Sequence, residues 1–232
     1  MQKRGSQSQG GISGKILEGK EILVLKLILK AYKKMCEERC YPEVRHEVWF
    51  SAVLEGYIDR LCPEYERLTR HHWHVMREKP NDDERIRTGQ SDPKAAPRID
   101  IVITCWKGLG GQRMKFPFES KRLAENDSDL IRWYIQKGLK DRYLNEAKDY
   151  SAGLSWGGMI GYILQGSHYA IVDKLNDQVN KQLSGFAEHL VIDQPIEGFD
   201  AIYRSRHQLT SDTDILTIVH LFLPFLLEEA HV

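Results

Sequence analysis

The chain has 232 residues, of which 41% are hydrophobic and 28% charged, and its formal net charge is +0. This length allows one well-buried domain or at most two small ones, and the composition is that of an ordinary soluble globular protein. Zero net charge excludes a global attraction to nucleic acid or to an anionic membrane, so any polyanion site must be a local patch.

The first third of the chain is predicted to be helical after a short arm. Residues 1–15 are polar and Gly/Ser-rich, which predicts a disordered arm and no secretion signal. Residues 16–232 are expected to form a single domain. Apolar residues at helical spacing predict a helix over 16–36, and a second helix is expected to start after Pro42 and to stop near Pro63.

The middle of the chain predicts a β-hairpin. Residues 77–97 are polar and rich in turn formers, which predicts an exposed loop. The stretches RIDIVITCW (98–106) and MKFPFESKRL (114–123) predict two strands, and the GLGG between them predicts a flexible turn longer than the two-residue kind.

The last part of the chain predicts helices followed by strands. Residues 124–150 are charged and expected to be helical in part, and the glycines of 151–167 are interpreted as letting a helix approach the sheet closely. An amphipathic helix is expected over 170–183, followed by strands at 201–207 and 214–225. This order predicts an α/β fold with a mixed central sheet flanked by helices.

The cysteines and the apolar runs indicate a soluble, cytoplasmic protein. Four cysteines in 232 residues do not make a secreted disulfide scaffold, and they predict reduced thiols. Cys36 and Cys40 lie four residues apart, but no second pair of zinc ligands follows at a matching spacing. The apolar runs ILVLKLIL and ILTIVHLFLPFLL are too short or too interrupted to cross ~30 Å of hydrocarbon, so no membrane partner is expected.

The predicted hairpin places charged side chains in otherwise apolar strands. Side chains alternate along a strand, so Glu119 and Lys121 share a face, and Asp100 interrupts the neighbouring β-branched strand. Two interpretations remain open. Asp100 and Glu119 bind a hard divalent cation while Lys121 orients or activates a water, or the three residues form a salt-bridge cluster without chemistry.

RID, followed by 18 residues and then ESK, resembles the PD-(D/E)xK nuclease superfamily. That resemblance implies a restriction-endonuclease-like fold, with Mg²⁺ or Mn²⁺ held by Asp100, Glu119 and the Ser120 carbonyl, and with Lys121 positioning the attacking water. Ile99 stands where the family's proline precedes the first acid, and that proline is dispensable across the superfamily.

Members of this superfamily often carry a further acid on the helix before the hairpin, as Glu-x-x-x-Ser/Thr followed by leucines. Glu47, followed by Ser51 and Leu54, resembles that pattern and is the expected additional metal ligand. Glu43 and Glu55 are rivals because each lies one or two turns away on a similar face. The alternative for Glu47 is a solvated helix position.

Basic and aromatic residues follow the hairpin and predict a route for nucleic acid. Basic side chains neutralise phosphates, and aromatic side chains such as Trp133 can stack on bases. The alternative is a solvated amphipathic helix whose cations are balanced by neighbouring acids. Arg204, Arg206 and His207 are expected to add charge near the end of a late strand. The residues predicted to contact phosphates are Arg122, Lys137, Lys140 and Arg142.

The resemblance implies a divalent-metal-dependent nuclease, with DNA favoured over RNA, that acts as a homo-oligomer or with a partner subunit. By analogy it is expected to be an effector or subunit of a prokaryotic anti-phage defence or DNA-processing system. One alternative is a catalytically silent scaffold or nucleic-acid-binding subunit that keeps the fold. Another is a zinc hydrolase built on His71, His72 and His74.

Overall fold

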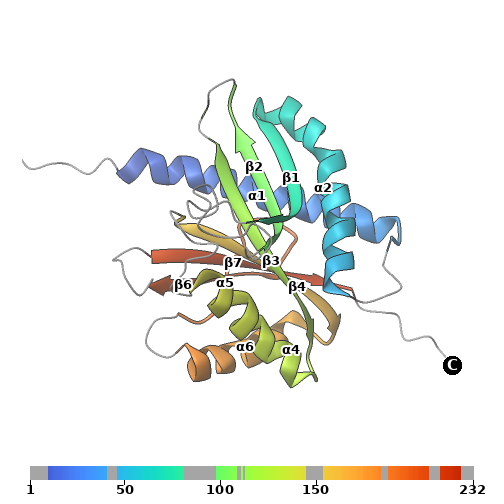
Figure 1. Ribbon diagram of the computed structural model, residues 1–232, viewed down its shortest axis with the longest axis vertical. Coiled ribbons are helices and arrows are strands. Elements are labelled where there is room, and N and C mark those ends of the chain that lie inside the picture. Colours follow the sequence, from blue (N-terminus) through green and yellow to red (C-terminus); the bar gives the residue numbers. More distant parts are fainter. Residues whose placement is uncertain are drawn as a thin grey trace, which may run out of the picture.

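The structure is a computed structural model that describes residues 10–40, 46–80, 98–108, 111, 113–144, 154–183, 188–208 and 215–225. Within these residues, one seven-stranded sheet organises the chain, in the order β1-β2-β3-β4-β7-β6-β5 (Figure 1). The strands are β1 (His72–Pro80), β2 (Arg98–Trp106), β3 (Met114–Ala124), β4 (Trp156–Gln165), β5 (Val191–Ile192), β6 (Ile202–Gln208) and β7 (Ile215–Pro224). The helices are α1 (Gly10–Glu37), α2 (Glu47–Thr69), α4 (Ser128–Trp133), the π-helical η1 (Tyr134–Lys140), α5 (Asp141–Tyr143) and α6 (His168–Gln182).

The sheet is mixed, which confirms the predicted α/β class. Strands β3, β4 and β7 run parallel to one another, and the remaining neighbours are antiparallel. Parallel neighbours cannot be joined by a tight turn, so the chain crosses over between β3 and β4. The described part of that crossover is α4, η1 and α5, which follow one another without a break.

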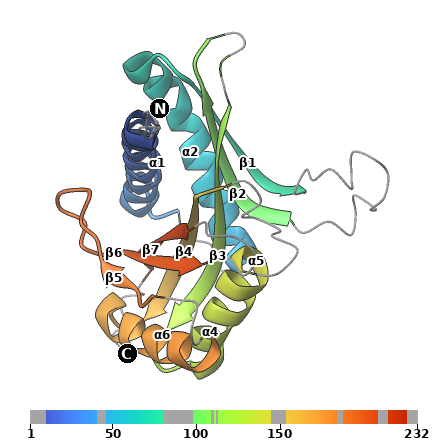
Figure 2. The ribbon, with the colours of Figure 1, turned by 90° about the vertical axis from the view of Figure 1, so that its left-hand side faces the viewer.

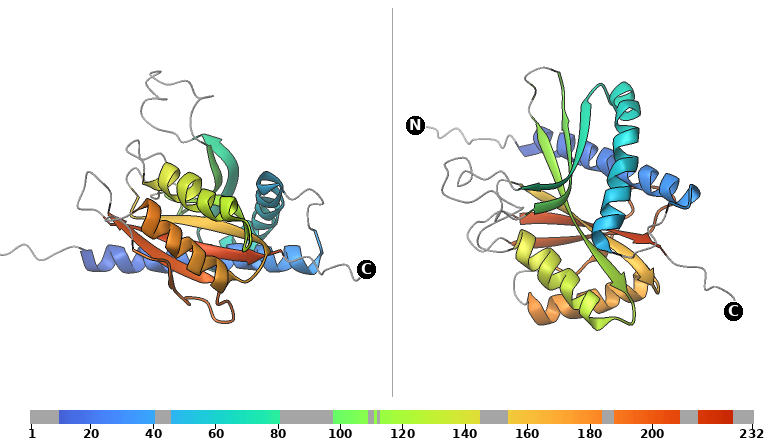
Figure 3. Two further views of the ribbon diagram at one scale, coloured as in Figure 1. Left: turned by 90° about the horizontal axis from the view of Figure 1, so that it is seen from below. Right: turned by 45° about the vertical axis from the view of Figure 1, so that its right-hand side comes forward.

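Helices cover both faces of the sheet, as Figure 2 shows. Helices α1 and α2 pack on one face, where residues such as Leu54 meet Phe118 of β3 and Tyr162 of β4. Helices α4 and α6 lie side by side on the other face together with η1, and Ile135 and Leu175 belong to this second core (Figure 3). Strands buried on both faces read as continuous apolar runs, which explains the sequence of β7.

The segment 151–167 was predicted to be a helix, and this prediction was wrong. Residues 156–165 form β4, a central strand between β3 and β7. Its glycines do reflect close packing, but between strands: a Cβ at Gly158 would lie 2.2 Å from ring atoms of Phe118, and one at Gly161 would lie 2.6 Å from Leu123. The glycines therefore make room for large side chains of β3.

The boundaries of both N-terminal helices differ from those expected. Helix α2 continues through Pro63 to Thr69, because its apolar face extends past the proline to the buried Tyr65, which packs edge-on against Trp73. Helix α1 begins at Gly10, so only residues 1–9 of the expected arm fall outside the described residues. Of the expected loop 77–97, the first four residues belong to β1 and the others lie outside the described residues.

Two smaller expectations concern the cysteines and membranes. Cys36, Cys40, Cys62 and Cys105 are all free thiols. Among the described helices, none combines the length and the apolar character that crossing a bilayer requires.

Candidate active site

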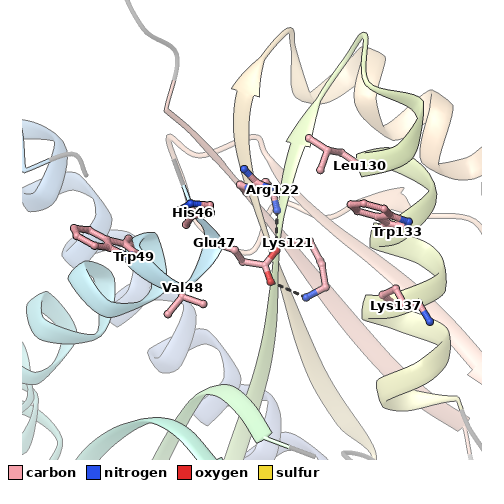
Figure 4. A pocket seen from close by; sticks show the side chains of 9 residues that line it. All are labelled: His46, Glu47, Val48, Trp49, Lys121, Arg122, Leu130, Trp133 and Lys137. Atoms are coloured by element: carbon pink, nitrogen blue, oxygen red, sulfur yellow. Dashed lines mark hydrogen bonds and ion pairs between the residues drawn. The ribbon is translucent and has the colours of Figure 1, made fainter. Parts of the chain in front are cut away.

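Oxygens from two elements, β3 and α2, surround the ammonium group of Lys121 in β3. Its Nζ lies 2.7 Å from Glu119 Oε1 on the same strand. It also lies 2.9 Å from Oε1 of Glu47, the first residue of α2, as Figure 4 shows. The same Nζ donates to the backbone carbonyl of Ser120 at 2.7 Å. Three oxygens that the sequence predicts as metal ligands therefore surround one cationic nitrogen.

The fourth predicted ligand, Asp100, is fixed beside this group by Ser120. The pairing of β2 with β3 begins at Ile101↔Phe118, so Asp100 lies just beyond the ladder. There its Oδ2 accepts hydrogen bonds from the Ser120 backbone N–H at 2.8 Å and from Ser120 Oγ at 2.9 Å. The side-chain carboxylate thus takes over the pairing where the backbone ladder stops.

A buried hydroxyl chain connects this pair to two other elements. Ser51 Oγ on α2 lies 2.8 Å from Ser120 Oγ and 3.1 Å from the Tyr162 hydroxyl on β4. Buried polar groups that satisfy one another hold their neighbours in one orientation. Ser51 therefore links Glu47, one turn earlier on the same helix, to the strand that carries Glu119 and Lys121.

Burial raises the pKa of two acids in this cluster, Glu119 and Glu47. Glu119 is 1% exposed. Burial, reinforced by the negative charge of Asp100, raises the pKa of Glu119 to about 7 despite the opposing attraction of Lys121. Burial also raises the pKa of Glu47. Arg142 adds a cation, with its Nε 3.5 Å from Glu119 Oε1.

Lys121 stays protonated in this setting. Burial alone would lower the pKa of its ammonium, but the carboxylates of Glu119 and Glu47, with Asp100 nearby, raise that pKa above its ordinary value. Lys121 is therefore a hydrogen-bond donor and a positive charge at neutral pH, and is unsuited to act as a general base.

The oxygen atoms of this cluster are of the kind that binds a hard divalent cation. In this structure, however, the ammonium group of Lys121 lies between them. Carboxylate and carbonyl oxygens are the ligands that Mg²⁺ and Mn²⁺ prefer. Across the described residues, however, no three His, Cys, Asp or Glu side chains are grouped so as to hold a metal ion. The geometry gives the reason: the ammonium lies between Glu119, Glu47 and the Ser120 carbonyl, so a metal would bind only with Lys121 moved aside.

Of the two candidate helix acids that the structure describes, Glu47 and Glu55, it is Glu47 that reaches the motif. Its Oε1 accepts from Lys121, and its Oε2 accepts from the Arg122 backbone N–H at 3.2 Å. Glu55 lies two turns further along α2, about 12 Å along the helix axis. Glu43 lies outside the described residues.

The four predicted phosphate-contact residues are placed differently. Arg122 and Lys137 line a pocket of about 460 Å³ next to the acidic cluster, shared with Glu47 and Lys121 (Figure 4). Lys137 also forms an ion pair with Asp141 at 3.0 Å. Arg142 faces Glu119, and Lys140 is exposed on η1. Contact of any of them with phosphate stays a prediction.

The histidine run does not form a zinc site among the described residues. His72 and His74 point to the exposed side of β1, and His71 Nδ1 lies 2.7 Å from the carbonyl oxygen of Thr69. His72 Nδ1 is 3.6 Å from Glu66, an acid on the preceding helix. This is a surface arrangement of strand and helix end.

A buried chain of hydrogen bonds through Ser205 and two histidines was not predicted from the sequence, and the prediction for one of these histidines, His207, was wrong. Ser205 Oγ lies 2.7 Å from His207 Nε2 and 2.8 Å from His220 Nε2, and His220 Nδ1 lies 3.0 Å from the Tyr134 hydroxyl. His207 was expected to add charge, but it is 1% exposed and burial lowers its pKa to about 4, so it is neutral. Ser205 and His207 lie two positions apart on β6 and so share its buried face, and this spacing was the signal available in the sequence.

Comparison with known proteins adds no assignment. No protein-family model, curated protein or solved structure gives a significant match to this chain. The case for a function therefore depends on the geometry of the site.

Proposed function

We propose that this chain is a divalent-metal-dependent nuclease with a restriction-endonuclease-like fold. The observation that carries the proposal is the convergence of Glu47, Asp100 and the Glu119–Lys121 segment, which come from α2, β2 and β3. Bringing one buried and two half-buried carboxyl groups to one place destabilises a fold unless cations compensate them. Such clusters are common at sites that bind metal or perform acid–base chemistry.

The strand order supports the fold assignment. The motif hairpin, β2 and β3, is followed by the helical crossover α4-η1-α5 and then by β4 parallel to β3. A helix packed on the sheet after the Glu-x-Lys strand, followed by further strands, is what the resemblance to the PD-(D/E)xK superfamily implies.

Each residue has a defined role in the proposal. Asp100, Glu119 and the Ser120 carbonyl, with Glu47, would hold Mg²⁺ or Mn²⁺, and the metal would supply stabilisation of charge on a phosphoryl oxygen and a lowered pKa of water. Lys121, protonated and displaced from its present carboxylates, donates a hydrogen bond that positions the attacking water. Arg142 remains near Glu119 to balance charge.

A second candidate is a catalytically silent protein that keeps this architecture as a scaffold or nucleic-acid-binding subunit. The observation that favours it is the pair of direct ion pairs that Lys121 forms with Glu119 and with Glu47. The two candidate functions differ in one respect: in a nuclease, the Lys121 side chain must move away from Glu119 and Glu47 when a divalent cation binds.

Cleavage assays on plasmid DNA, single-stranded DNA and RNA with Mg²⁺ or Mn²⁺ test the proposal. Wild type should cut at least one substrate, and Lys121→Ala should reduce the rate at least about 100-fold. Lys30→Ala is the matched control, because it removes an ion pair of the same length, Lys30–Glu64 at 2.7 Å, outside the site. Equal cleavage by Lys121→Ala and Lys30→Ala would contradict the assigned role.

Metal titration by calorimetry separates the two candidates where cleavage is absent. Mn²⁺ should bind wild type, and Asp100→Asn should weaken binding at least about tenfold. Glu47→Gln should weaken it as well, whereas Glu55→Gln on the same helix should not. No heat of binding with any variant or with wild type would favour the scaffold. The preference for DNA over RNA, an oligomer or partner subunit, a cytoplasmic location and a role in prokaryotic defence or DNA processing remain part of the proposal.

A further inference from the structure

A pocket with aromatic and cationic walls adjoins the acidic cluster. It measures about 460 Å³, within the range of ligand-binding pockets. The first turn of α2 forms one wall, and α4 with η1 forms the other, with the end of β3 between them (Figure 4). Glu47 and Lys121 belong to both the pocket and the cluster, so a ligand in the pocket would lie directly against the proposed catalytic residues.

Two tryptophans border this pocket and are unusually exposed. Trp49 on α2 is 54% exposed and Trp133 at the end of α4 is 44% exposed. By comparison, Trp73 and Trp156 belong to the hydrophobic core and are each only 4% exposed. A tryptophan left in water forgoes the burial of a large apolar surface. Two of them at one pocket indicate a ligand with flat apolar faces.

The cations in the same walls indicate that this ligand is anionic. Arg122 lies between the tryptophans at the end of β3, and Lys137 lies one turn after Trp133. Lys137 is 59% exposed on its side chain and shares its charge with Asp141. Flat faces that alternate with phosphates are the chemistry of a polynucleotide, and aromatic side chains interleaved with basic ones are how proteins bind its single-stranded form.

We propose that this pocket binds an unpaired nucleotide and that the protein acts on single-stranded nucleic acid. The inference rests on the proposed function and names the substrate class for it. Trp133 and Trp49 stack on bases, Arg122 and Lys137 contact the backbone, and the phosphate next to the stacked base reaches the Asp100–Glu119 cluster. Within a duplex both faces of each base are already stacked on neighbours, so a paired base would have to leave the helix first.

The test measures binding without cleavage. Fluorescence anisotropy of labelled oligonucleotides of about 12 nucleotides, a length within the known site sizes, is recorded in EDTA for single-stranded DNA, single-stranded RNA and the matching DNA duplex. Single strands should bind more tightly than the duplex, and the DNA and RNA arms identify the sugar preference. Trp133→Ala should weaken single-strand binding roughly 5- to 100-fold, and Trp133→Phe should keep most of it because a ring remains.

Matched controls come from exposed side chains elsewhere. Tyr169→Ala removes a 53% exposed aromatic from α6, and Leu68→Ala removes a 71% exposed side chain from the far end of α2, as a control for Trp49→Ala. Neither control should change binding. Thermal melting of every variant confirms that it is folded.

Four outcomes would overturn the inference: tighter binding of duplex than of single strands, equal affinities for Trp133→Ala and Tyr169→Ala, equal affinities for Trp49→Ala and Leu68→Ala, or no binding of any polynucleotide. These outcomes are distinguishable from failure of the nuclease proposal. If the protein cleaves nucleic acid with metal but the tryptophan variants bind oligonucleotides as tightly as wild type, the nuclease proposal stands and the nucleotide pocket is rejected. If single strands bind in a tryptophan-dependent way but are not cleaved, the nucleotide pocket stands and the nuclease proposal is rejected.

Discussion

Asp100 and Ser120 are joined by two hydrogen bonds that end on a single carboxylate oxygen, from the Ser120 backbone N–H at 2.8 Å and from its Oγ at 2.9 Å. The backbone bond fixes where the carboxylate lies relative to β3. The hydroxyl bond connects it through Ser51 to α2 and Tyr162. One serine therefore aligns acids that are far apart in the sequence.

The substitution Ser120→Ala should distinguish the contribution of the hydroxyl hydrogen bond from that of the backbone hydrogen bond. It keeps the backbone N–H but removes a fully buried hydroxyl and leaves Ser51 short of one partner, so the free energy of unfolding should fall by about 1–3 kcal/mol. Metal binding should weaken too, because Asp100 loses part of its orientation. Urea denaturation and metal titration measure the two effects. The exposed Ser128→Ala is the control, and equal stability of the two variants would argue against the hydroxyl chain.

Metal affinity should depend on pH through Glu119. Its pKa is raised to about 7, and a carboxyl group must lose its proton to bind a metal. Affinity for Mn²⁺ should therefore rise about tenfold per pH unit below pH 7 and level off above it. Calorimetry from about pH 5.5 to about pH 8.5 measures this dependence. Glu119→Gln should bind weakly and without the step near pH 7, and a flat wild-type profile would show that Glu119 is no ligand.

The same pKa has a consequence for stability without metal. The folded pKa of Glu119 lies above its ordinary value of 4.5, so the folded state binds the extra proton between about pH 4.5 and pH 7. Its contribution is favourable below that range and is lost as pH rises through 7. Metal should consequently raise the melting temperature more at pH 8 than at pH 6.

The glycines of β4 should not tolerate a side chain. Gly158→Ala would place a Cβ 2.2 Å from the Phe118 ring, which is packed in the core beneath the motif strand. Overpacking of this kind costs about 1–3 kcal/mol. Gly56→Ala is the matched control, because a Cβ there meets nothing within 4 Å and the helix should gain up to about 1 kcal/mol. Chemical denaturation should move the two midpoints in opposite directions, and equal shifts would contradict the packing described for β4.

The buried histidines should make the fold acid-sensitive. Burial lowers the pKa of His207 to about 4 from 6.5, and it lowers that of His220 as well, so the unfolded chain binds more protons between these values. Stability should therefore fall as pH drops through this range, by about 2 kcal/mol between pH 7 and pH 5 for His207 alone. Glu119 acts in the opposite direction, so the informative quantity is the difference between wild type and His207→Gln in urea denaturation at both pH values. Equal pH dependence in the two proteins would show that His207 titrates normally.

The candidate site was accessible to sequence reasoning because its key residues are local. Asp100 interrupts one β-branched strand, and Glu119 and Lys121 share a face of the next by the alternation of strand side chains. The α/β class and the hairpin followed from the same periodicities. Long periodic segments such as α6 were also predicted, because an amphipathic helix carries its signal in its own residues.

What the sequence by itself determined about this protein is therefore the motif strands, the amphipathic helices and the class of fold. Tertiary structure alone decided that 156–165 is a central strand, because burial on both faces removes the alternation that distinguishes a strand from a helix. It also decided that Glu47, and not Glu55, reaches Lys121, and that Trp49 and Trp133 border one pocket. These contacts join residues that are more than 70 positions apart in the sequence. The packing of the helices on the sheet brings them together, and no local sequence pattern encodes that packing.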